Sequence, residues 1–166
     1  MKTQFKAVCL FITFLFCTLG LSAQYGTSVG LRLGSPTSLS LKHFISESNA
    51  LEAYVGFRSY SWGSNWVGIN GAYLRHQELD EITEGLTWYV GGGLGVYFWN
   101  YDDFFFDNYS TTTIGLQGYA GVEYTFDSVP LAISIDWIPT FFVGTTYLSS
   151  FGARYGSLGV RYIFNE

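Results

Sequence analysis

Two histidines, His43 and His76, are the only imidazoles in the chain, so a serine–histidine–acid site would have to be built on one of them. His43 shares the alternation of Leu39 and Leu41 at the end of one predicted strand, and His76 ends another beside the acidic run QELDE. We expect each to be an interfacial or strand-capping histidine. We therefore predict no catalytic residue.

Three carboxylates in NYDDFFFDNY, Asp102, Asp103 and Asp107, raise the question of calcium binding. Their spacing around three phenylalanines does not match a known calcium loop. A solvated acidic loop is the better interpretation, and we expect neither a metal site nor a cofactor.

The same segment holds an aromatic cluster, and exposed aromatic clusters can mark a contact surface. Its members are Tyr101, Phe104, Phe105, Phe106 and Tyr109. We hypothesise that they bind lipopolysaccharide, another surface molecule or a partner protein. The alternative is that these rings fold back over the rim of the structure.

The elements that carry these residues are best read from residues 86–99, LTWYVGGGLGVYFW, a stretch without a charge. As a helix it fails, because each of four interior glycines costs about 1 kcal/mol relative to alanine. As a strand it has one apolar face, with Trp88, Val90 and Leu94, and one face that is small in the middle, with Gly91 and Gly93.

Seven further segments share this alternation of an apolar face and a polar, glycine-bearing face. We predict eight strands in all, at residues 25–33, 38–45, 51–58, 66–76, 86–99, 111–126, 131–138 and 152–164. Charged residues make up only 13% of the chain, against about 25% in ordinary soluble proteins. We therefore expect the apolar faces to point outward to lipid and the strands to close into an antiparallel, up-and-down transmembrane β-barrel.

The polar faces then point inward and carry isolated charges of both signs. These are Arg32, Lys42, Arg58 and Arg161 together with Glu52, Glu123 and Asp136. So small a barrel is filled by its own side chains, so we predict that the three carboxylates pair with some of the four cations in a structural network.

The ends of the predicted barrel differ. Aromatic residues near the strand ends on the outward face suggest girdles at the two membrane interfaces. They are Tyr25, Trp88, Phe98, Tyr124, Phe126, Trp137, Tyr162 and Phe164. We expect inner turns at residues 46–50, 77–85 and 127–130, and outer loops at residues 34–37, 59–65, 100–110 and 139–151.

Residues 1–23 have the layout of a secretory signal peptide, with Lys2 and Lys6 before an apolar run that ends in small residues. A membrane anchor helix and a lipid-modified Cys17 are the alternatives. Both cysteines lie in this segment, so the domain of residues 24–166 has no disulfide. That domain keeps all thirteen acidic residues, which argues against binding to nucleic acid.

Several stretches resemble the small outer-membrane β-barrel family of the OmpX and OmpA-transmembrane-domain type, in its Bacteroidota version. They are GLRLGSPTSLSLKHFISESNALEAYVGF, WYVGGGLGVYF, VPLAISIDWIPTF and GVRYIFNE. The resemblance implies the outer membrane of a diderm bacterium and contact with outer-membrane lipid and lipopolysaccharide. We expect both mature termini in the periplasm, because the N-terminus starts on the inner side after removal of the signal peptide and an even number of strands returns the C-terminus to that side. The last strand, with Tyr162 and Phe164, resembles the signal read by the barrel-assembly machinery.

Our leading interpretation is a non-enzymatic barrel with a structural or surface-interaction role in the envelope. Some small outer-membrane barrels are lipid A-modifying enzymes or proteases, but KHFIS lacks the His-x-Ser-Asn run that a deacylase would resemble. The pattern is also compatible with a narrow channel or binder of small hydrophobic molecules, and with a secreted soluble barrel that resembles a lipocalin.

Overall fold

The computed structural model describes residues 26–59, 64–103, 106–143, 151–153 and 155–164, with only the backbone of residues 64, 101–103 and 106–109. The predicted signal peptide lies outside the described residues and stays a prediction. In the described part of the chain, no helix has the length and hydrophobicity needed to span a membrane. The strands are β1 (Thr27–Ser35), β2 (Thr37–Phe44), β3 (Asn49–Ser59), β4 (Ser64–Glu78), β5 (Leu86–Asp103), β6 (Phe106–Thr125), β7 (Leu131–Trp137), β8 (Thr140–Val143), β9 (Phe151–Gly152) and β10 (Gly156–Phe164).

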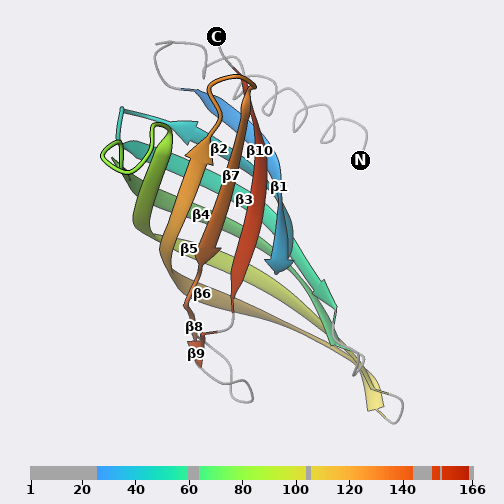
Figure 1. Cartoon of the computed structure of the whole chain (residues 1–166). Coiled ribbons are helices and arrows are strands. Elements are labelled where there is room, and N and C mark those ends of the chain that lie inside the picture. Colours follow the sequence, from blue (N-terminus) through green and yellow to red (C-terminus); the bar gives the residue numbers. More distant parts are fainter. Residues whose placement is uncertain (1–25, 60–63, 104–105, 144–150, 154, 165–166) are drawn as a thin grey trace, which may run out of the picture.

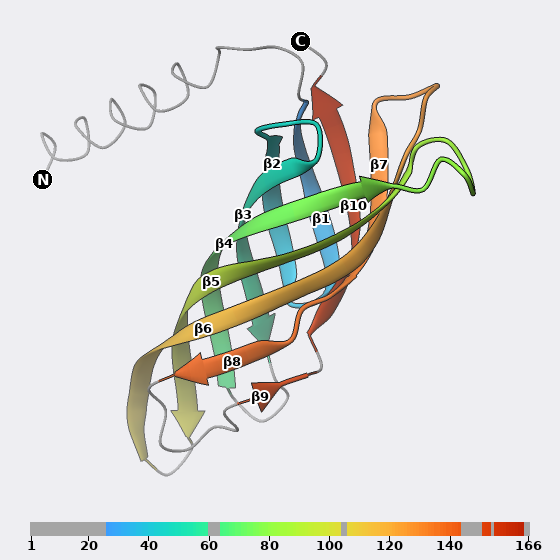
Figure 2. The same cartoon turned by 90° about the vertical axis from the view of Figure 1, so that its left-hand side faces the viewer.

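These strands form one antiparallel sheet that closes on itself (Figures 1 and 2). Neighbours follow the order β5, β4, β3, β2, β1, β10, β7 and β6, and β6 pairs with β5 to complete the circle. Because β8 continues β7 and β9 leads into β10, the wall is a closed barrel of eight strands. The predicted fold class is confirmed.

The predicted seventh strand is longer than expected, because Pro139 interrupts the ladder without ending it. The pairs Ala120↔Trp137 and Gln117↔Thr140 keep a single register on β6. Proline has no N–H to donate, but its carbonyl still accepts from Gly118 N at 2.9 Å. The expected outer loop at residues 139–151 therefore begins with strand β8.

The predicted eighth strand is divided instead of continuous. Between β9 and β10 the chain has one residue more than the strand opposite, since Thr140 pairs with Gly152 but Trp137 pairs with Gly156. Ile138 N bonds to Tyr155 O at 2.9 Å across the irregular stretch.

The outer surface of the wall is apolar. Leu94, Ile135 and Phe57 are 59%, 61% and 59% exposed, although they lie within the strands of the sheet. The neighbouring positions point inward and are buried or partly buried, as the sequence alternation predicts. Of the predicted girdle aromatics, Trp88, Phe98, Trp137, Tyr162 and Phe164 are exposed on this surface.

The two ends of the barrel differ in construction (Figure 1). At one end, called the turn end here, the β2–β3, β4–β5 and β6–β7 turns lie beside the start of β1 and the end of β10. At the opposite end, called the hairpin end, β5 and β6 project as a long ribbon with the pairs Asn100↔Ser110 and Asp103↔Phe106. The expected outer loop at residues 100–110 is thus mostly strand, because its aromatic and threonine-rich flanks have high strand propensity.

Candidate functional site: the charged interior

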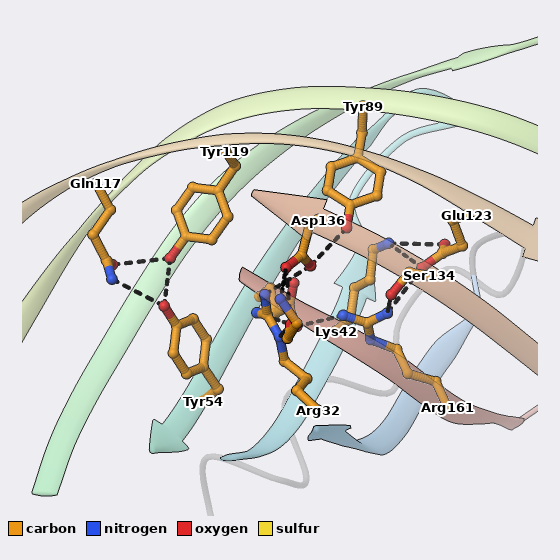
Figure 3. A network of polar contacts seen from close by, with 12 residues as sticks. Arg32, Lys42, Tyr54, Tyr89, Gln117, Tyr119, Glu123, Ser134, Asp136 and Arg161 are labelled. Carbon is orange, nitrogen blue, oxygen red and sulfur yellow. Dashed lines mark hydrogen bonds and ion pairs between the residues drawn. The ribbon is translucent and has the colours of Figure 1, made fainter. Parts of the chain in front are cut away.

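Six of the seven charges predicted to face the interior meet inside the barrel (Figure 3). Strand alternation brings them from six different strands to one region of the lumen. They are Arg32 of β1, Lys42 of β2, Glu52 of β3, Glu123 of β6, Asp136 of β7 and Arg161 of β10.

Arg32 bonds to partners on three other strands. Its Nη1 lies 3.1 Å from Glu52 Oε1, and its Nη2 lies 2.7 Å from Asp136 Oδ2. Its Nε donates to Ser157 Oγ at 3.0 Å. Asp136 also accepts from Tyr89 Oη at 2.9 Å, so both side chains are held from several directions.

Arg161 occupies the adjacent strand and shares a carboxylate with Arg32. Its Nη2 lies 2.7 Å from Glu52 Oε1, and its Nη1 lies 3.0 Å from Glu123 Oε2. The same Nη1 donates to Ser134 Oγ at 2.7 Å. Glu52 therefore bridges two guanidinium groups.

Lys42 connects this network to His76. Its Nζ lies 2.8 Å and 2.9 Å from the two oxygens of Glu123, and 2.8 Å from His76 Nε2. Because an ammonium group only donates, His76 Nε2 accepts here and the imidazole proton sits on Nδ1. The ring packs against Phe44 and Tyr89, with both centroid distances at 4.9 Å.

The interpretation of His76 as an interfacial or capping residue is therefore wrong. The side chain is only 3% exposed and lies in the lumen. Its position in the alternation of β4, on the same phase as Trp66, Ala72 and Leu74, was the signal that identified it as inward-facing. His43 differs, since it is partly buried and its Nδ1 lies 2.9 Å from Thr27 Oγ1.

Arg58 lies apart from the six charges. It is six residues beyond Glu52 on β3, about 20 Å at the usual rise of a strand. Its guanidinium carbon is 5.8 Å from the centre of the Tyr155 ring. The prediction that Arg58 has the same inward phase as Glu52 was correct. Arg58 does not join the network because it lies at a different height along the barrel axis.

The network balances three cations with three carboxylates. All six side chains are nearly inaccessible, with Arg32, Lys42 and Arg161 each 1% exposed. Removing one member of such a buried set leaves a charge without compensation, which costs about 3–5 kcal/mol. The interior is thus a structural element in which each charge depends on the others.

A second polar cluster lies next to the charges and contains no ion. Tyr54 Oη and Tyr119 Oη are 2.8 Å apart, and Gln117 Nε2 donates to Tyr54 Oη at 2.9 Å and to Tyr97 Oη at 2.7 Å. Arg32 connects the two clusters, because its guanidinium carbon lies 4.6 Å from the centre of the Tyr54 ring. Sequence analysis did not identify this cluster, although the inward phase of these tyrosines follows from the alternation of their strands.

Toward the hairpin end, aromatic rings fill the lumen. Trp66 is 1% exposed and contacts Tyr97 and Trp99 with centroid distances of 4.9 Å and 5.7 Å. Phe142 packs against Tyr97 at 5.1 Å and Tyr155 at 5.9 Å. The interior therefore changes along the barrel axis from ions, through hydroxyls, to aromatic rings.

Inward glycines create the space for two of the buried tyrosine rings, those of Tyr97 and Tyr119. A Cβ at Gly115 would approach Tyr97 Cε2 to 2.7 Å, and a Cβ at Gly93 would approach Tyr119 Cε2 to 3.0 Å. Both distances are shorter than ordinary contacts. Within the triple glycine, Gly93 thus leaves room for the Tyr119 ring, whereas Gly91 faces Leu74.

The contacts of the candidate catalytic and metal-binding residues can be stated directly. Among the described residues, no three His, Cys, Asp or Glu side chains are grouped so that they could hold a metal ion. His76 Nε2 is engaged by Lys42 instead of a serine hydroxyl. Phe104 and Phe105 of the predicted contact surface lie outside the described residues, and Tyr101, Phe106 and Tyr109 belong to the β5–β6 ribbon, with no side-chain description.

Comparison with known proteins identifies the fold. The sequence matches no protein-family model and no curated protein. Among solved structures, the chain is similar to Neisserial surface protein A (NspA), with a TM-score of 0.60, 12% identity, and coverage of 86% of this chain and 94% of that chain. It is also similar to the N-terminal β-barrel domain of Pseudomonas aeruginosa OprF, with a TM-score of 0.57, 16% identity, and coverage of 84% and 96%. Both are small outer-membrane β-barrels of eight strands, and this chain shares their fold.

Proposed function

We propose that this protein is an integral outer-membrane β-barrel without enzymatic activity, which serves the cell envelope as a structural element or in surface interactions. One observation carries the proposal: the wall is apolar outside, while the inside holds a charge-balanced, fully buried ion network. A soluble protein has the opposite arrangement, because water solvates charges and apolar side chains fill the core. The similarity in fold to NspA and the OprF domain supports this proposal.

The packing of the interior argues against a water-filled pore. Trp66, Arg32 and Arg161 are among the largest fully buried side chains, and they extend into the lumen from strands β4, β1 and β10. An eight-stranded barrel has an interior just wide enough for its side chains. We therefore expect single-channel recordings of the reconstituted protein to show no stable conductance.

The contacts of the polar groups argue against hydrolysis or acyl transfer. A catalytic histidine needs a hydroxyl or water to activate, but His76 Nε2 accepts from Lys42. Glu123 and Asp136 are each bound to a cation. Lipid A mass spectra from strains with and without the gene test this part of the proposal, since an enzyme would leave a mass difference.

Membrane insertion is tested by fractionation and by heat-dependent gel mobility. We expect the protein in the outer-membrane fraction, and a folded band that shifts when the sample is boiled. A chain recovered in soluble form without detergent would contradict the proposal. It would indicate instead a soluble barrel with Trp88, Val90 and Leu94 shielded.

Two contacts complete the proposal. We expect the final strand, through Tyr162 and Phe164, to engage the barrel-assembly machinery during insertion. Both rings are exposed on the outer wall, and they contact each other with a centroid distance of 5.2 Å. The second contact is between the projecting β5–β6 ribbon and lipopolysaccharide, a surface molecule or a partner protein.

A deletion strain distinguishes the structural role from the surface-interaction role. A structural role predicts increased permeability of the envelope to large or hydrophobic compounds. An interaction role predicts an intact barrier and a loss of binding at the cell surface. Both roles predict an unchanged lipid A composition.

A further inference from the structure

Arg75 is anomalous on the outer wall of the barrel. Among the strand residues whose side chains the structure describes, it is the one Lys, Arg, Asp or Glu that has the outward phase within the ladder. Its neighbours on that phase of β4, Ile69 and Tyr73, are 57% and 48% exposed and apolar or aromatic. A cation on a lipid-facing wall needs a physical reason, because an arginine there costs about 2–4 kcal/mol at the bilayer midplane.

The position of Arg75 supplies part of that reason. It lies three residues before the end of β4 at the turn end, where the cost of a charge falls to about 0–1 kcal/mol. In the β4–β5 ladder Arg75 pairs with Val90 and Gln77 pairs with Trp88, so the guanidinium shares this level with the aromatic girdle. This is the depth at which lipid headgroups begin.

The exposed residues next to Arg75 in the ladder supply further hydrogen-bond donors. Gln77 is exposed on the same phase, and Trp88 is 37% exposed on the adjacent strand. On the other side Arg75 pairs with Asn49, whose Oδ1 already accepts from Tyr73 Oη at 2.9 Å. A guanidinium, an amide and an indole N–H together suit an acceptor with several oxygens, and a phosphate is the acceptor present at this depth of a membrane.

Two acidic turns limit which headgroup fits. The β4–β5 turn presents Asp80, Glu81 and Glu84, all exposed, and Leu79 accepts from Ile82 N at 2.8 Å, which orders the turn. Figure 2 shows this turn at the same end as the β2–β3 turn, which carries the exposed Glu47. A headgroup with net negative charge is repelled by these carboxylates, whereas a zwitterionic headgroup extends an amine toward them.

From these positions in the ladder we infer that Arg75, with Gln77 and Trp88, forms a binding site for the phosphate of a zwitterionic phospholipid, phosphatidylethanolamine, in the leaflet at the turn end. The inference rests on the proposed membrane location and adds a specific lipid contact to it. The site fixes the depth of the barrel by tying β4 to the headgroup layer. It also distinguishes lipids by net charge.

The test compares lipid binding by folded wild-type protein and variants, using native mass spectrometry in nonionic detergent with matched-chain phosphatidylethanolamine or phosphatidylglycerol. We expect wild type to retain phosphatidylethanolamine about tenfold more strongly than Arg75→Gln does, which is the effect of losing one hydrogen bond between charged groups. Arg75→Lys keeps the charge and is expected to restore part of the binding. Equal binding by wild type and Arg75→Gln would overturn the site.

A second set of variants tests the role of the turn. Asp80→Asn with Glu84→Gln should raise binding of phosphatidylglycerol toward that of phosphatidylethanolamine, whereas Asp127→Asn, in the β6–β7 turn, should leave the preference unchanged. If wild type shows no preference between the two lipids, the headgroup assignment is wrong. Displacement by glycerophosphoethanolamine at the same concentration would assign the site to a soluble phosphate ester instead of a membrane lipid.

The same samples separate this inference from the proposed function. Each variant is first run with and without boiling, and only protein with a heat-shifted folded band enters the comparison. If the Arg75→Gln protein folds, inserts into the membrane and binds lipid as wild type does, the lipid site is refuted and the membrane barrel is not. If the wild-type chain does not insert into vesicles, both the lipid site and the membrane barrel are refuted.

Discussion

Arg32 and Arg161, on the paired strands β1 and β10, bind one and the same oxygen, Glu52 Oε1, at 3.1 Å and 2.7 Å. Two guanidinium groups fit side by side because glycines lie opposite them in the ladder, Gly159 across from Arg32 and Gly30 across from Arg161. A Cβ at Gly159 would come within 3.1 Å of Arg161 Nη1. The shared carboxylate therefore depends on both the charge and the space that the sequence provides.

Glu52→Gln removes the charge that both arginines share. We expect a loss of about 3–5 kcal/mol in the free energy of unfolding, because two buried cations lose their common counter-charge. Urea unfolding of the protein in vesicles, followed by tryptophan fluorescence, measures this change. The control is Glu47→Gln in the exposed β2–β3 turn, for which we expect a change within about 0.5 kcal/mol.

Lys42 and Glu123 should be energetically coupled. Lys42→Met removes one of the two cations that Glu123 binds, and Glu123→Gln removes the carboxylate that Lys42 binds, whereas the double variant removes both members of the contact at 2.8 Å. We expect a coupling energy of about 0.5–3 kcal/mol in a double-mutant cycle of unfolding free energies. Strictly additive losses would contradict a direct interaction between these residues.

Adjacent glycines on opposite faces of β5 should respond differently to alanine. A Cβ at Gly93 would meet Gly71 O at 2.5 Å and Tyr119 at 3.0 Å, whereas at Gly92 the nearest atom is Gln117 O at 3.8 Å. We expect Gly93→Ala to cost about 1–3 kcal/mol through overpacking. Gly92 faces outward, so we expect Gly92→Ala to leave the free energy of unfolding unchanged or slightly higher. The urea midpoints of both variants, measured in parallel, test this difference.

Serine replacement of Phe104, Phe105 and Phe106 tests the predicted contact surface. We expect a folded, heat-shifting protein with weakened binding of purified lipopolysaccharide or of the surface partner, since the variant loses aromatic contact area and keeps the barrel. Surface plasmon resonance with detergent-solubilised protein measures the affinity. Unchanged affinity for every candidate would refute the contact surface.

Much of the barrel follows from the period of two in the sequence. Alternation alone assigned Leu94 to one face and Gly93 to the other, because successive side chains of a strand point in opposite directions. The same rule assigned all six network charges to the interior. Strand ends were less predictable: Pro139 ended a predicted strand, yet the ladder resumes at Thr140 in the same register.

What only the tertiary structure decided is which inward residues meet. Arg32 bonds to Asp136, 104 positions away, whereas Arg58 shares the inward phase and lies elsewhere. His76 joins Lys42 for the same reason, since both lie at one height near the turn end. Alternation determines the direction of a side chain, but its height along the axis depends on the register of every strand around the closed barrel, and that register is a property of the assembled sheet.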